Sequence, residues 1–481
     1  MARVEPLFYG CTFDDFLFRP QYSPVASRKE VDLKSQVCRG ISVNIPIVGA
    51  NMDTITRERM AETLALEGCV GVLDRNCPIQ NQAKRVEFVK RQHSYVIEKP
   101  VTLHRRESIG RAKEVMKAHG ISSILVRESS QMNRLMGILT HRDILNAEER
   151  DDEMIWSFMT PFKKLVWAKQ GISLEDAEKL MLEKRVEKLP LINKHRRICG
   201  LITLRDIQLA KQKPYSVQDP KGRLIVGAAI GSVKDYLERA EALIGSGVDF
   251  LLMDVAHAHS APIRKAVSEF RAKFGKFPLV CGNVATYEGA KFLADMGVDG
   301  IKVGIGPGKG CLTRLETGAG VPQLQAIREA YLACRGKIPI IADGGVREHK
   351  DIALALLCGA NTVMLGSILA GTDETPGETI ETRDGKFKVY RGMTSPEAVL
   401  AGVEEGEMVA EALSTPAEGQ EYKVEYAGNV VNIISRIAGH LRSAVSYAGE
   451  RNLSEARRKF SRNLELFIQL SEAAKKESFV R

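Results

Sequence analysis

Residues 300–314 read GIKVGIGPGKGCLTR, a short apolar run that passes directly into a glycine-rich loop. The run at 300–303 has the length and the continuous hydrophobicity of a parallel strand that is buried on both faces of its sheet. The loop places a cysteine, Cys311, among four glycines and a proline. A buried strand that ends in such a loop is typical of α/β proteins, whose reacting groups follow the carboxyl ends of the strands.

Seven more runs of this kind occur along the chain, at 45–48, 70–73, 224–227, 250–253, 278–280, 338–341 and 362–365. Helical stretches separate them, at 233–246, 260–274, 286–296 and 348–358. Eight strands that alternate with helices predict a closed (β/α)₈ barrel of the TIM type. The alternative, an open doubly wound sheet, is disfavoured because no G-x-G-x-x-G sequence opens a helix after a first strand.

An internal repeat interrupts the barrel pattern. Residues 108–116 (SIGRAKEVM) are echoed by 173–181 (SLEDAEKLM), and each copy continues through an apolar strand into a segment that ends in Arg-Asp. The repeated order resembles a tandem pair of cystathionine-β-synthase (CBS) domains. We therefore expect a barrel formed by 1–94 and 214–481, with CBS domains inserted at 95–153 and 154–213.

In CBS pairs the terminal Asp often contacts the ribose of an adenine or guanine nucleotide. The matching residues in this sequence are Asp143 and Asp206, which follow Thr140 and Thr203. The resemblance implies a regulatory ATP or GTP site at these four residues. The alternative is that each Asp only caps the helix that follows it, because aspartate is a preferred N-cap residue.

Composition limits the class of protein. The chain has 481 residues, of which 44% are hydrophobic and 27% charged, and its net charge is +9. This charge is spread over a long chain with only 6% aromatic residues, which disfavours a nucleic-acid groove. No apolar run approaches the ~20 residues that cross a bilayer, and no secretory signal is recognisable. Nine cysteines without a C-x-x-C pair fit a reducing compartment. We expect a cytoplasmic protein that binds neither nucleic acid nor membrane.

Polar and glycine-bearing turns follow the predicted strands. These turns contain Asn51, Asp254, Asn283, Asp343-Gly344-Gly345 and Gly366-Ser367. Glycines let backbone N–H groups approach an anion closely, so several such turns at one rim predict a phosphate-binding site. Asp343 is a candidate partner for the vicinal hydroxyls of a sugar.

Cys311 is the candidate nucleophile. It is flanked by Lys309 and Arg314, and nearby cations favour the thiolate, which is the reactive form of cysteine. The alternative is a free cysteine that happens to fall in a turn. That alternative better describes Cys69 and Cys358, which lie in apolar helical sequence.

Several motifs together resemble the inosine monophosphate (IMP) dehydrogenase / guanosine monophosphate (GMP) reductase family. They are TFDD (12–15), ANMDT (50–54), the loop 304–314, ADGG (342–345), YRGM (390–393) and LRS (441–443). The resemblance spans essentially the whole chain. It implies a barrel enzyme whose Cys311 attacks C2 of a purine mononucleotide and forms a covalent thioimidate, while a hydride moves to or from a nicotinamide cofactor, NADPH or NAD.

The resemblance also implies roles for individual residues of the nucleotide site. Thr313 would transfer protons together with Glu418, and Asp343 would hold the ribose. Phosphate contacts are implied at Gly345, Gly366, Ser367 and Tyr390. The rest of the substrate site is expected at Asn51, Gly392, Met393 and Lys309. Lys309 stands where the family usually has a serine, and a lysine could bind phosphate as a point charge or alter which nucleotide fits.

The cofactor side is implied in the same way. Asp254 and Asn283 would line the nicotinamide side, and Gly304 and Gly306 belong to the Cys loop that packs against the ligand. A potassium ion at Gly306, Gly308 and Cys311 is usual for the dehydrogenases, and the sequence does not decide whether it is present.

Two reactions occur in this family, and the segment 393–419 distinguishes them. The dehydrogenase activates water with an Arg-Tyr pair on a flap, whereas the reductase expels ammonia from GMP and needs no such water. Residues 393–419 contain neither arginine nor tyrosine. The motif ANMD at 50–53 also resembles the reductases. We therefore favour GMP reductase over IMP dehydrogenase, although a CBS pair is commoner in the dehydrogenases.

A third hypothesis is a non-catalytic regulator that senses nucleotides through Asp143 and Asp206. The presence of Cys311, Thr313 and Glu418 disfavours it. By analogy with the family we expect a homotetramer, which CBS pairs can join into an octamer. The choice between NADPH and NADH and the nucleotide bound by the CBS pair remain open at this level.

Overall fold

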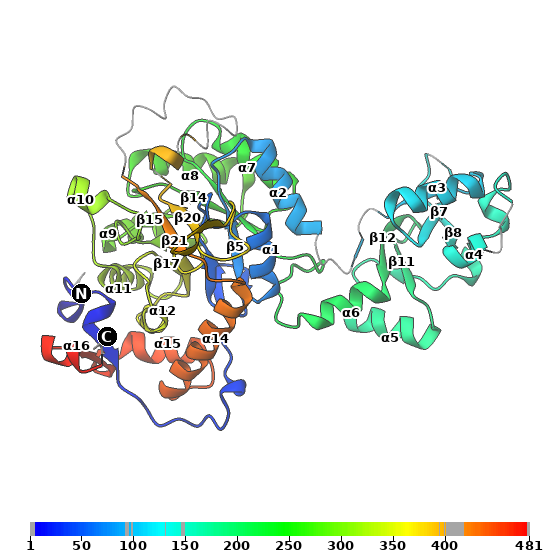
Figure 1. Cartoon of the computed structure of the whole chain (residues 1–481). Helices are drawn as coiled ribbons and strands as arrows, with labels where there is room; N and C mark the ends of the chain where they lie inside the picture. Colours follow the sequence, from blue (N-terminus) through cyan, green and yellow to red (C-terminus); the bar gives the residue numbers. More distant parts are fainter. Residues whose placement is uncertain are drawn as a thin grey trace. The chain divides into compact units, whose positions relative to one another are not determined.

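The computed structural model describes residues 5–91, 96–97, 100–129, 131–145, 150–393, 395–398, 400 and 418–478. The chain forms two compact units, and each is described by itself (Figure 1). Unit 1 comprises Met1–Gln92, Tyr215–Val217 and Leu224–Arg481, and unit 2 comprises His93–Pro214 and Gln218–Arg223. None of the described helices is both long enough and apolar enough to cross a bilayer.

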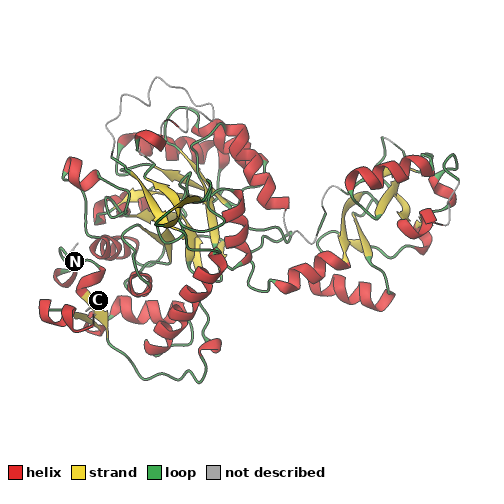
Figure 2. Cartoon of the chain, in the orientation of Figure 1, coloured by secondary structure: helices red, strands yellow, loops and turns green. Residues whose placement is uncertain are grey.

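Unit 1 is built on a closed barrel of eight parallel strands, which confirms the predicted fold class (Figure 2). In the order of their pairing around the barrel, the strands are β13 (Gly227–Ile230), β14 (Phe250–Asp254), β15 (Leu279–Val284), β16 (Gly300–Val303), β17 (Ile340–Asp343), β18 (Thr362–Leu365), β4 (Ile47–Gly49) and β5 (Val70–Leu73). The helices of this unit surround them: α1 (Glu58–Leu66), α2 (Ile79–Arg91), α7 (Tyr236–Gly245), α8 (Ala261–Phe274), α9 (Tyr287–Asp295), α11 (Gln323–Cys334), α12 (His349–Leu357) and α14 (Val430–Tyr447).

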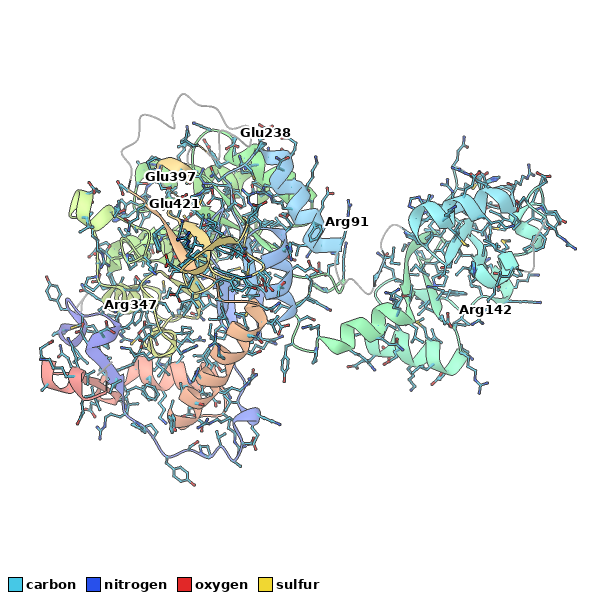
Figure 3. All side chains as sticks on the ribbon, viewed as in Figure 1. Arg91, Arg142, Glu238, Arg347, Glu397 and Glu421 are labelled. Carbon is cyan, nitrogen blue, oxygen red and sulfur yellow. The ribbon has the colours of Figure 1, made fainter. Side chains whose placement is uncertain are left out.

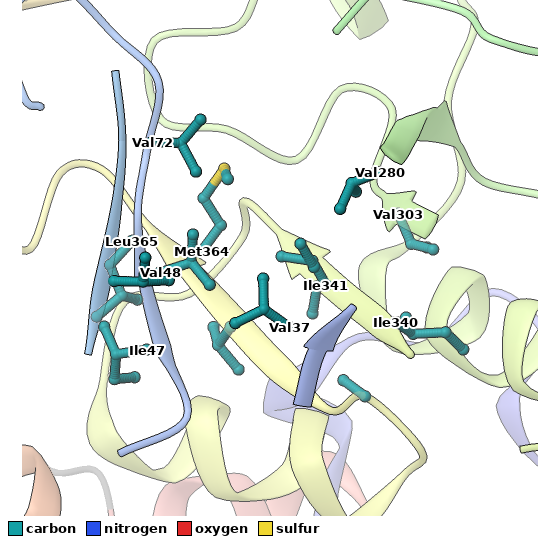
Figure 4. Packing of buried hydrophobic residues seen from close by; sticks show 14 of the residues in the cluster. Val37, Ile47, Val48, Val72, Val280, Val303, Ile340, Ile341, Met364 and Leu365 are labelled. Carbon is teal, nitrogen blue, oxygen red and sulfur yellow. The ribbon is translucent and has the colours of Figure 1, made fainter. Parts of the chain in front are cut away.

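The strand sequences are largely apolar, with exceptions such as Lys302 in β16, because helices cover the sheet on its outer face. Strands β5, β13, β16 and β18 are buried at every residue. Figure 4 shows part of this core, including Val48, Ile341 and Met364, which are at most 2% exposed. The helices supply the matching apolar faces, as where Ala290 and Leu293 of α9 are fully buried.

Three predicted strands begin two or more residues late in the structure: those at 224–227, 45–48 and 338–341, the last of which is β17 at Ile340–Asp343. The prediction placed one strand at 224–227, but β13 begins at Gly227 and runs to Ile230. Residues 224–226 are buried for another reason: Ile225 N–H donates to Val217 O (3.0 Å) and Val226 N–H donates to Asp249 Oδ2 (2.8 Å). Strand β4 likewise begins at Ile47 rather than at 45, after Pro46, which has no N–H to donate to a neighbouring strand.

Smaller elements complete unit 1. They are β1 (Phe16–Phe18) paired with β22 (Phe467–Gln469), β2 (Ser35–Cys38) with β3 (Ile41–Val43), the sheet of β19 (Ile380–Thr382), β20 (Gly385–Arg391) and β21 (Glu421–Glu425), and the helices α10 (Thr313–Thr317), α15 (Leu453–Arg462) and α16 (Glu472–Ser478). The pairing of β20 with β21 matters for the site, because it fixes the two ends of the segment 392–420 next to each other.

Unit 2 contains the two copies of the repeat. The first copy supplies β6 (Thr102–His104), α3 (Ile109–His119), β7 (Ser123–Arg127), β8 (Leu135–Thr140) and α4 (His141–Leu145). Its three strands form a four-stranded sheet together with β9 (Thr160–Pro161). The second copy supplies β10 (Ala168–Lys169), α5 (Leu174–Lys184), β11 (Lys188–Ile192), β12 (Ile198–Thr203) and α6 (Leu204–Gln212), with a three-stranded sheet.

The repeated helices begin and end in the same way. Ser108 caps α3 by accepting from Arg111 N–H (3.2 Å), and Ser173 caps α5 by accepting from Asp176 N–H (3.1 Å). Both helices end at a residue in the left-handed conformation, Gly120 and Arg185. The sequence repeat therefore corresponds to a repeat of local structure, because serine caps and left-handed ends fix helix boundaries.

Gly71 provides a test of barrel packing. A Cβ at Gly71 of β5 would stand 2.7 Å from Ala61 Cα of α1, so Gly71→Ala forces the helix away from the strand. We expect Gly71→Ala to lower the free energy of unfolding by about 1–3 kcal/mol, measured by urea denaturation. The control is Gly439→Ala in α14, where a Cβ meets nothing within 4 Å. This change should stabilise the protein by about 0.5–1 kcal/mol, because alanine favours the helix. Equal effects of the two substitutions would contradict the packing described.

Candidate active site

A cavity of about 870 Å³ opens at the carboxyl ends of the barrel strands. A volume of this order is typical of small-molecule sites. The residues that line it come mainly from the loops after β4, β16, β17 and β18: Thr12, Ala50, Asn51, Met52, Asp254, Lys302, Pro307, Gly308, Lys309, Gly310, Cys311, Arg314, Gln323, Asp343, Gly344, Gly345, Val346, Arg347, Met364, Leu365, Gly366, Ser367, Ile368, Tyr390, Gly392, Met393 and Glu418.

The Cys loop is held against the segment 418–420 by backbone hydrogen bonds. Leu312 N–H donates to Glu418 O (2.7 Å) and Gln420 N–H donates to Gly310 O (3.2 Å), so that Cys311 pairs with Gly419. The close approach requires small residues, because a Cβ at Gly392 would stand 2.5 Å from Gly310 O. This pairing places Glu418 next to Cys311, although the two residues are more than a hundred positions apart in sequence.

A chain of hydrogen bonds runs from the nucleophile to this carboxylate. The Cys311 thiol donates to Thr313 Oγ1 at 3.2 Å, and the Thr313 hydroxyl donates to Glu418 Oε2 at 2.6 Å. Cys311 is partly exposed to the cavity, whereas Cys69 and Cys358 are fully buried, and burial raises the pKa of both thiols. The geometry can move a proton between sulfur, hydroxyl and carboxylate.

Several residues expected to bind phosphate lie beside the Cys loop, since a Cβ at Gly310 would stand 3.1 Å from Tyr390 Cε1. The Tyr390 hydroxyl lies beside Gly366, since a Cβ at Gly366 would stand 3.1 Å from it. Burial, with smaller contributions from Asp343 and Cys311, raises the pKa of Tyr390, so its hydroxyl remains a proton donor. The Lys309 ammonium lies 5.1 Å from the centre of the Tyr422 ring, which packs on Tyr390 with centroids 5.2 Å apart. The Lys309 side chain therefore packs against this aromatic pair through the Tyr422 ring.

Lys302, a strand residue that was not among the predicted site residues, is the buried centre of a polar network at the cavity wall. Its ammonium is 2.8 Å from Asp254 Oδ1 and 2.5 Å from Asp343 Oδ2, and its side chain is only 4% exposed. Asn51 donates to Asp254 Oδ2 (2.8 Å), and Asn283 donates to Asp343 Oδ2 (3.0 Å). A lysine inside an otherwise apolar buried strand was the available signal, because lysine is rarely buried unless it is paired.

The predicted cofactor residues separate into two groups. Asp254 lines the cavity, whereas Asn283, Gly304 and Gly306 lie outside the set of lining residues. Asn283 supports the Cys loop from outside the cavity, since its side chain donates to Gly304 O at 2.6 Å. A Cβ at Gly304 would overlap the Asp343 carbonyl oxygen, so this glycine allows the Cys loop to pack closely on β17.

Asp254, as a hydrogen-bond acceptor at the cavity wall, fits a nicotinamide cofactor. Burial would raise the pKa of Asp254, but the Lys302 ammonium and the hydrogen bonds from Lys302 and Asn51 lower it below its ordinary value. An ionised carboxylate at the cavity wall accepts hydrogen bonds from a carboxamide or from ribose hydroxyls. Both groups occur in a nicotinamide dinucleotide.

The residues predicted to bind potassium fit a cation less well. A Cβ at Gly306 would stand 2.9 Å from Arg314 Nε, so the guanidinium packs on this part of the loop. The Gly308 carbonyl already accepts from Cys311 N–H at 3.0 Å. The positive charge of Arg314 beside Gly306 disfavours a second cation there.

Arg391 and Asp53 form an ion pair beside the cavity rim. Arg391 Nη2 is 2.7 Å from Asp53 Oδ2, and a second carboxylate, Glu421 (labelled in Figure 3), lies 3.7 Å from its Nη1. Asp53 N–H donates to Met393 Sδ at 3.3 Å. The ion pair therefore fixes the end of β20, from which Gly392 and Met393 reach the cavity.

The four residues predicted to bind a regulatory nucleotide lie in unit 2. Asp143 Oδ2 accepts from both Thr140 N–H (2.7 Å) and the Thr140 hydroxyl (2.8 Å), which is the geometry of a helix cap at α4. Thr203 is buried at the end of β12, and the side chain of Asp206 lies outside the described residues. Arg142, next to Asp143, projects into solvent on the same helix (Figure 3).

A family model described as the IMP dehydrogenase / GMP reductase domain matches residues 10–481. The chain belongs to this family. It is 42% identical over 484 residues to inosine-5'-monophosphate dehydrogenase of Aquifex aeolicus, an alignment that covers 100% of this chain and 97% of the relative. It is also 42% identical over 475 residues to the enzyme of that name from Nitrosopumilus maritimus, covering 98% and 97% of the two chains.

A solved structure of GMP reductase from Trypanosoma brucei is also similar to this member of the family. It is a cysteine-to-alanine variant in complex with guanosine 5'-monophosphate, with a TM-score of 0.83, 37% identity and 98% of each chain covered. The chain is therefore an NAD(P)-dependent oxidoreductase whose substrate is a purine mononucleotide. This membership, with the intact Cys311–Thr313–Glu418 chain, argues against the non-catalytic regulator.

Cys311→Ala should abolish turnover and leave nucleotide binding within about threefold of wild type, because the cavity wall that holds the nucleotide is unchanged. Turnover and equilibrium binding of GMP and IMP test this. Cys199→Ala is the matched control: Cys199 is also partly exposed, but it lies on β12 of unit 2. If Cys311→Ala retained a tenth of the wild-type activity, covalent catalysis at this residue would be wrong.

Proposed function

We propose that this member of the family is a GMP reductase, which converts GMP and NADPH into IMP, ammonia and NADP⁺. The observation that carries the proposal is the absence of arginine and tyrosine from residues 393–419. Dehydrogenases of the family use an Arg-Tyr pair in this region to activate the water that hydrolyses the thioimidate. Residues 401–417 lie outside the described part of the chain, so the argument rests on their sequence.

The arginine that precedes this segment cannot supply the missing base. Burial opposes the charge of Arg391, but the hydrogen bonds and the negative charge of Asp53 raise its pKa above the ordinary value. A guanidinium that is to deprotonate water needs a lowered pKa instead. Arg391 therefore serves the geometry of the site and does not replace the hydrolytic base.

The Cys311–Thr313–Glu418 chain suits the loss of ammonia. As the Cys311 sulfur bonds to C2 of GMP, the thiol proton passes through the Thr313 hydroxyl to Glu418. The same path returns a proton to the exocyclic amine, which leaves as ammonia with the C2–N electron pair and gives the thioimidate. General acid–base catalysis of this kind typically contributes 10²–10⁴-fold.

The second half of the reaction restores the enzyme. The nicotinamide cofactor, when bound, supplies the hydride that C2 accepts. The C–S bond then breaks with its electron pair on Cys311, IMP is released, and the Cys311 thiolate takes up a proton from solvent to restore the thiol. Across both halves GMP gains a hydride and a proton and loses ammonia, so the overall reaction balances without a water molecule.

The nucleotide-binding roles remain proposals that the cavity supports. Asp343 would bind the ribose hydroxyls, while Gly345, Gly366, Ser367 and Tyr390 would bind phosphate. Lys309 would add a positive charge near the same group, where it lies along the Tyr422 ring. Asn51, Gly392 and Met393 line the same cavity and would complete the substrate site.

IMP dehydrogenase is the second candidate. The curated relatives from Aquifex aeolicus and Nitrosopumilus maritimus, each 42% identical, carry that name. The GMP reductase of Trypanosoma brucei is 37% identical over nearly the same length. Overall identity therefore does not separate the two reactions, and the 393–419 segment is the more specific signal.

Unit 2 would be the tandem CBS pair, with domains at 95–153 and 154–213. A GMP reductase of Trypanosoma brucei solved in complex with guanosine 5'-triphosphate has a TM-score of 0.73 and 34% identity to this chain, which supports a purine triphosphate as regulator. Thr140, Asp143, Thr203 and Asp206 would form the site for ATP or GTP. The homotetramer or octamer expected from the family stays a prediction.

Two assays separate the candidate reactions. With GMP and NADPH we expect loss of NADPH absorbance and an equal release of ammonia, because the proton path serves an amine leaving group. With IMP and NAD⁺ we expect a rate at least a hundredfold lower. Formation of NADH and xanthosine monophosphate from IMP at the higher rate would overturn the assignment.

Glu418→Gln tests the proton path. The amide preserves shape but cannot shuttle the proton, so kcat of the favoured reaction should fall by about 10²-fold or more, while the KM for the nucleotide changes little. Glu425→Gln on the exposed edge of β21 is the control and should retain wild-type rates. A Glu418→Gln variant with normal kcat would remove Glu418 from the mechanism.

A further inference from the structure

We propose that Lys302 is a positioning residue that orders both ligand subsites through one buried ammonium group. It contacts Asp343, assigned above to the substrate ribose, and Asp254, which lines the cofactor side. The inference rests on the proposed function only in requiring a ribonucleotide and a nicotinamide cofactor. It concerns neither the direction of hydride transfer nor the fate of the amine.

The barrel register explains how one side chain reaches both carboxylates. Asp254 on β14 pairs with Gly282 on β15, and Gly282 pairs with Lys302 on β16. Gly282 has no side chain to separate the other two, and a Cβ there would stand 2.6 Å from Lys302 Cβ. On its other side β16 pairs with β17, which ends in Asp343. The Lys302 side chain therefore reaches across β15 to Asp254, two strands away, and to Asp343 on the adjacent strand.

The charges of the network depend on this cation. Burial opposes the charged form of Lys302, but the two carboxylates raise its pKa above the ordinary value, so the ammonium persists. Removal of a buried charge leaves its partner uncompensated, which is costly in a low-dielectric site. Without Lys302, Asp254 would keep the Asn51 amide and the charge of Arg75, and Asp343 would keep the Asn283 amide, but no described cation would contact both carboxylates.

The contacts also fix the direction of each carboxylate. Asp254 is held through both oxygens, Oδ1 by Lys302 and Oδ2 by Asn51. In Asp343 both contacts use Oδ2, one from Lys302 and one from Asn283, so Oδ1 remains as an acceptor for ribose hydroxyls. Because each carboxylate depends on the same ammonium, loss of Lys302 should disturb both subsites at once.

Equilibrium binding tests this directly. We expect Lys302→Met to weaken the binding of GMP and of NADPH each by at least tenfold in the full-length protein, with KM rising for both. Asp343→Asn should weaken chiefly GMP, and Asp254→Asn chiefly NADPH. Lys302→Arg retains the cation and should restore both affinities to within about threefold of wild type, a rescue that a purely space-filling role would not require.

The outcomes are decisive whichever reaction the enzyme prefers. A Lys302→Met variant that changes the affinity of one ligand only, or of neither, would overturn the proposal, as would a Lys302→Arg variant as defective as Lys302→Met. If Lys302→Met does not fold, Lys302→Met combined with Asp254→Asn keeps the net charge and should still weaken GMP tenfold. If wild type oxidises IMP, then IMP and NAD⁺ replace the two ligands, and the proposed function fails while Lys302 remains under test.

Discussion

The eight barrel strands run parallel and close on themselves, so all of their carboxyl ends meet at one rim. This constraint brings Asp254, Lys302 and Asp343 together from three strands that are far apart in sequence. It does not by itself bring in Glu418. That residue depends on a second, local constraint, the backbone pairing of Gly310 and Leu312 with residues 418–420. The barrel closure and the local backbone pairing together form the candidate site.

The barrel could be predicted because its physical cause is visible in short windows of sequence. Strands buried on both faces are continuously apolar, and the turns after them carry glycine or a polar residue. Boundaries were less accessible: residues 224–226 are as apolar as a strand, but they are buried by contacts with Val217 and Asp249 and precede β13. The hydrophobicity of residues 224–226 therefore reflects their burial and not pairing in the barrel sheet.

The candidate site was predicted in its chemistry more than in its arrangement. Cys311 and the glycine turns stand out locally, and the cavity includes Cys311, Asp343, Gly345, Gly366 and Ser367. The position of Asn283 behind Gly304 depends on contacts between neighbouring strands that no local pattern reveals. Lys302, in contrast, does carry a local signal, because it is a charged residue within an apolar strand. A buried charge needs a partner of opposite charge, so this signal points to neighbouring carboxylates.

The insertion point of unit 2 has a consequence of its own. Lys90, one residue before the end of α2, donates to Leu224 O at 2.9 Å, so the place where the chain departs from unit 1 is tied to the place where it returns. Val217 N–H is in turn anchored on Ala65 O at 2.8 Å. Domain insertions are tolerated where the two ends of the interrupted chain lie close together. The two ends of the interrupted barrel chain are therefore joined by contacts within unit 1 itself, and the continuity of the catalytic scaffold does not rely on the residues inserted between them.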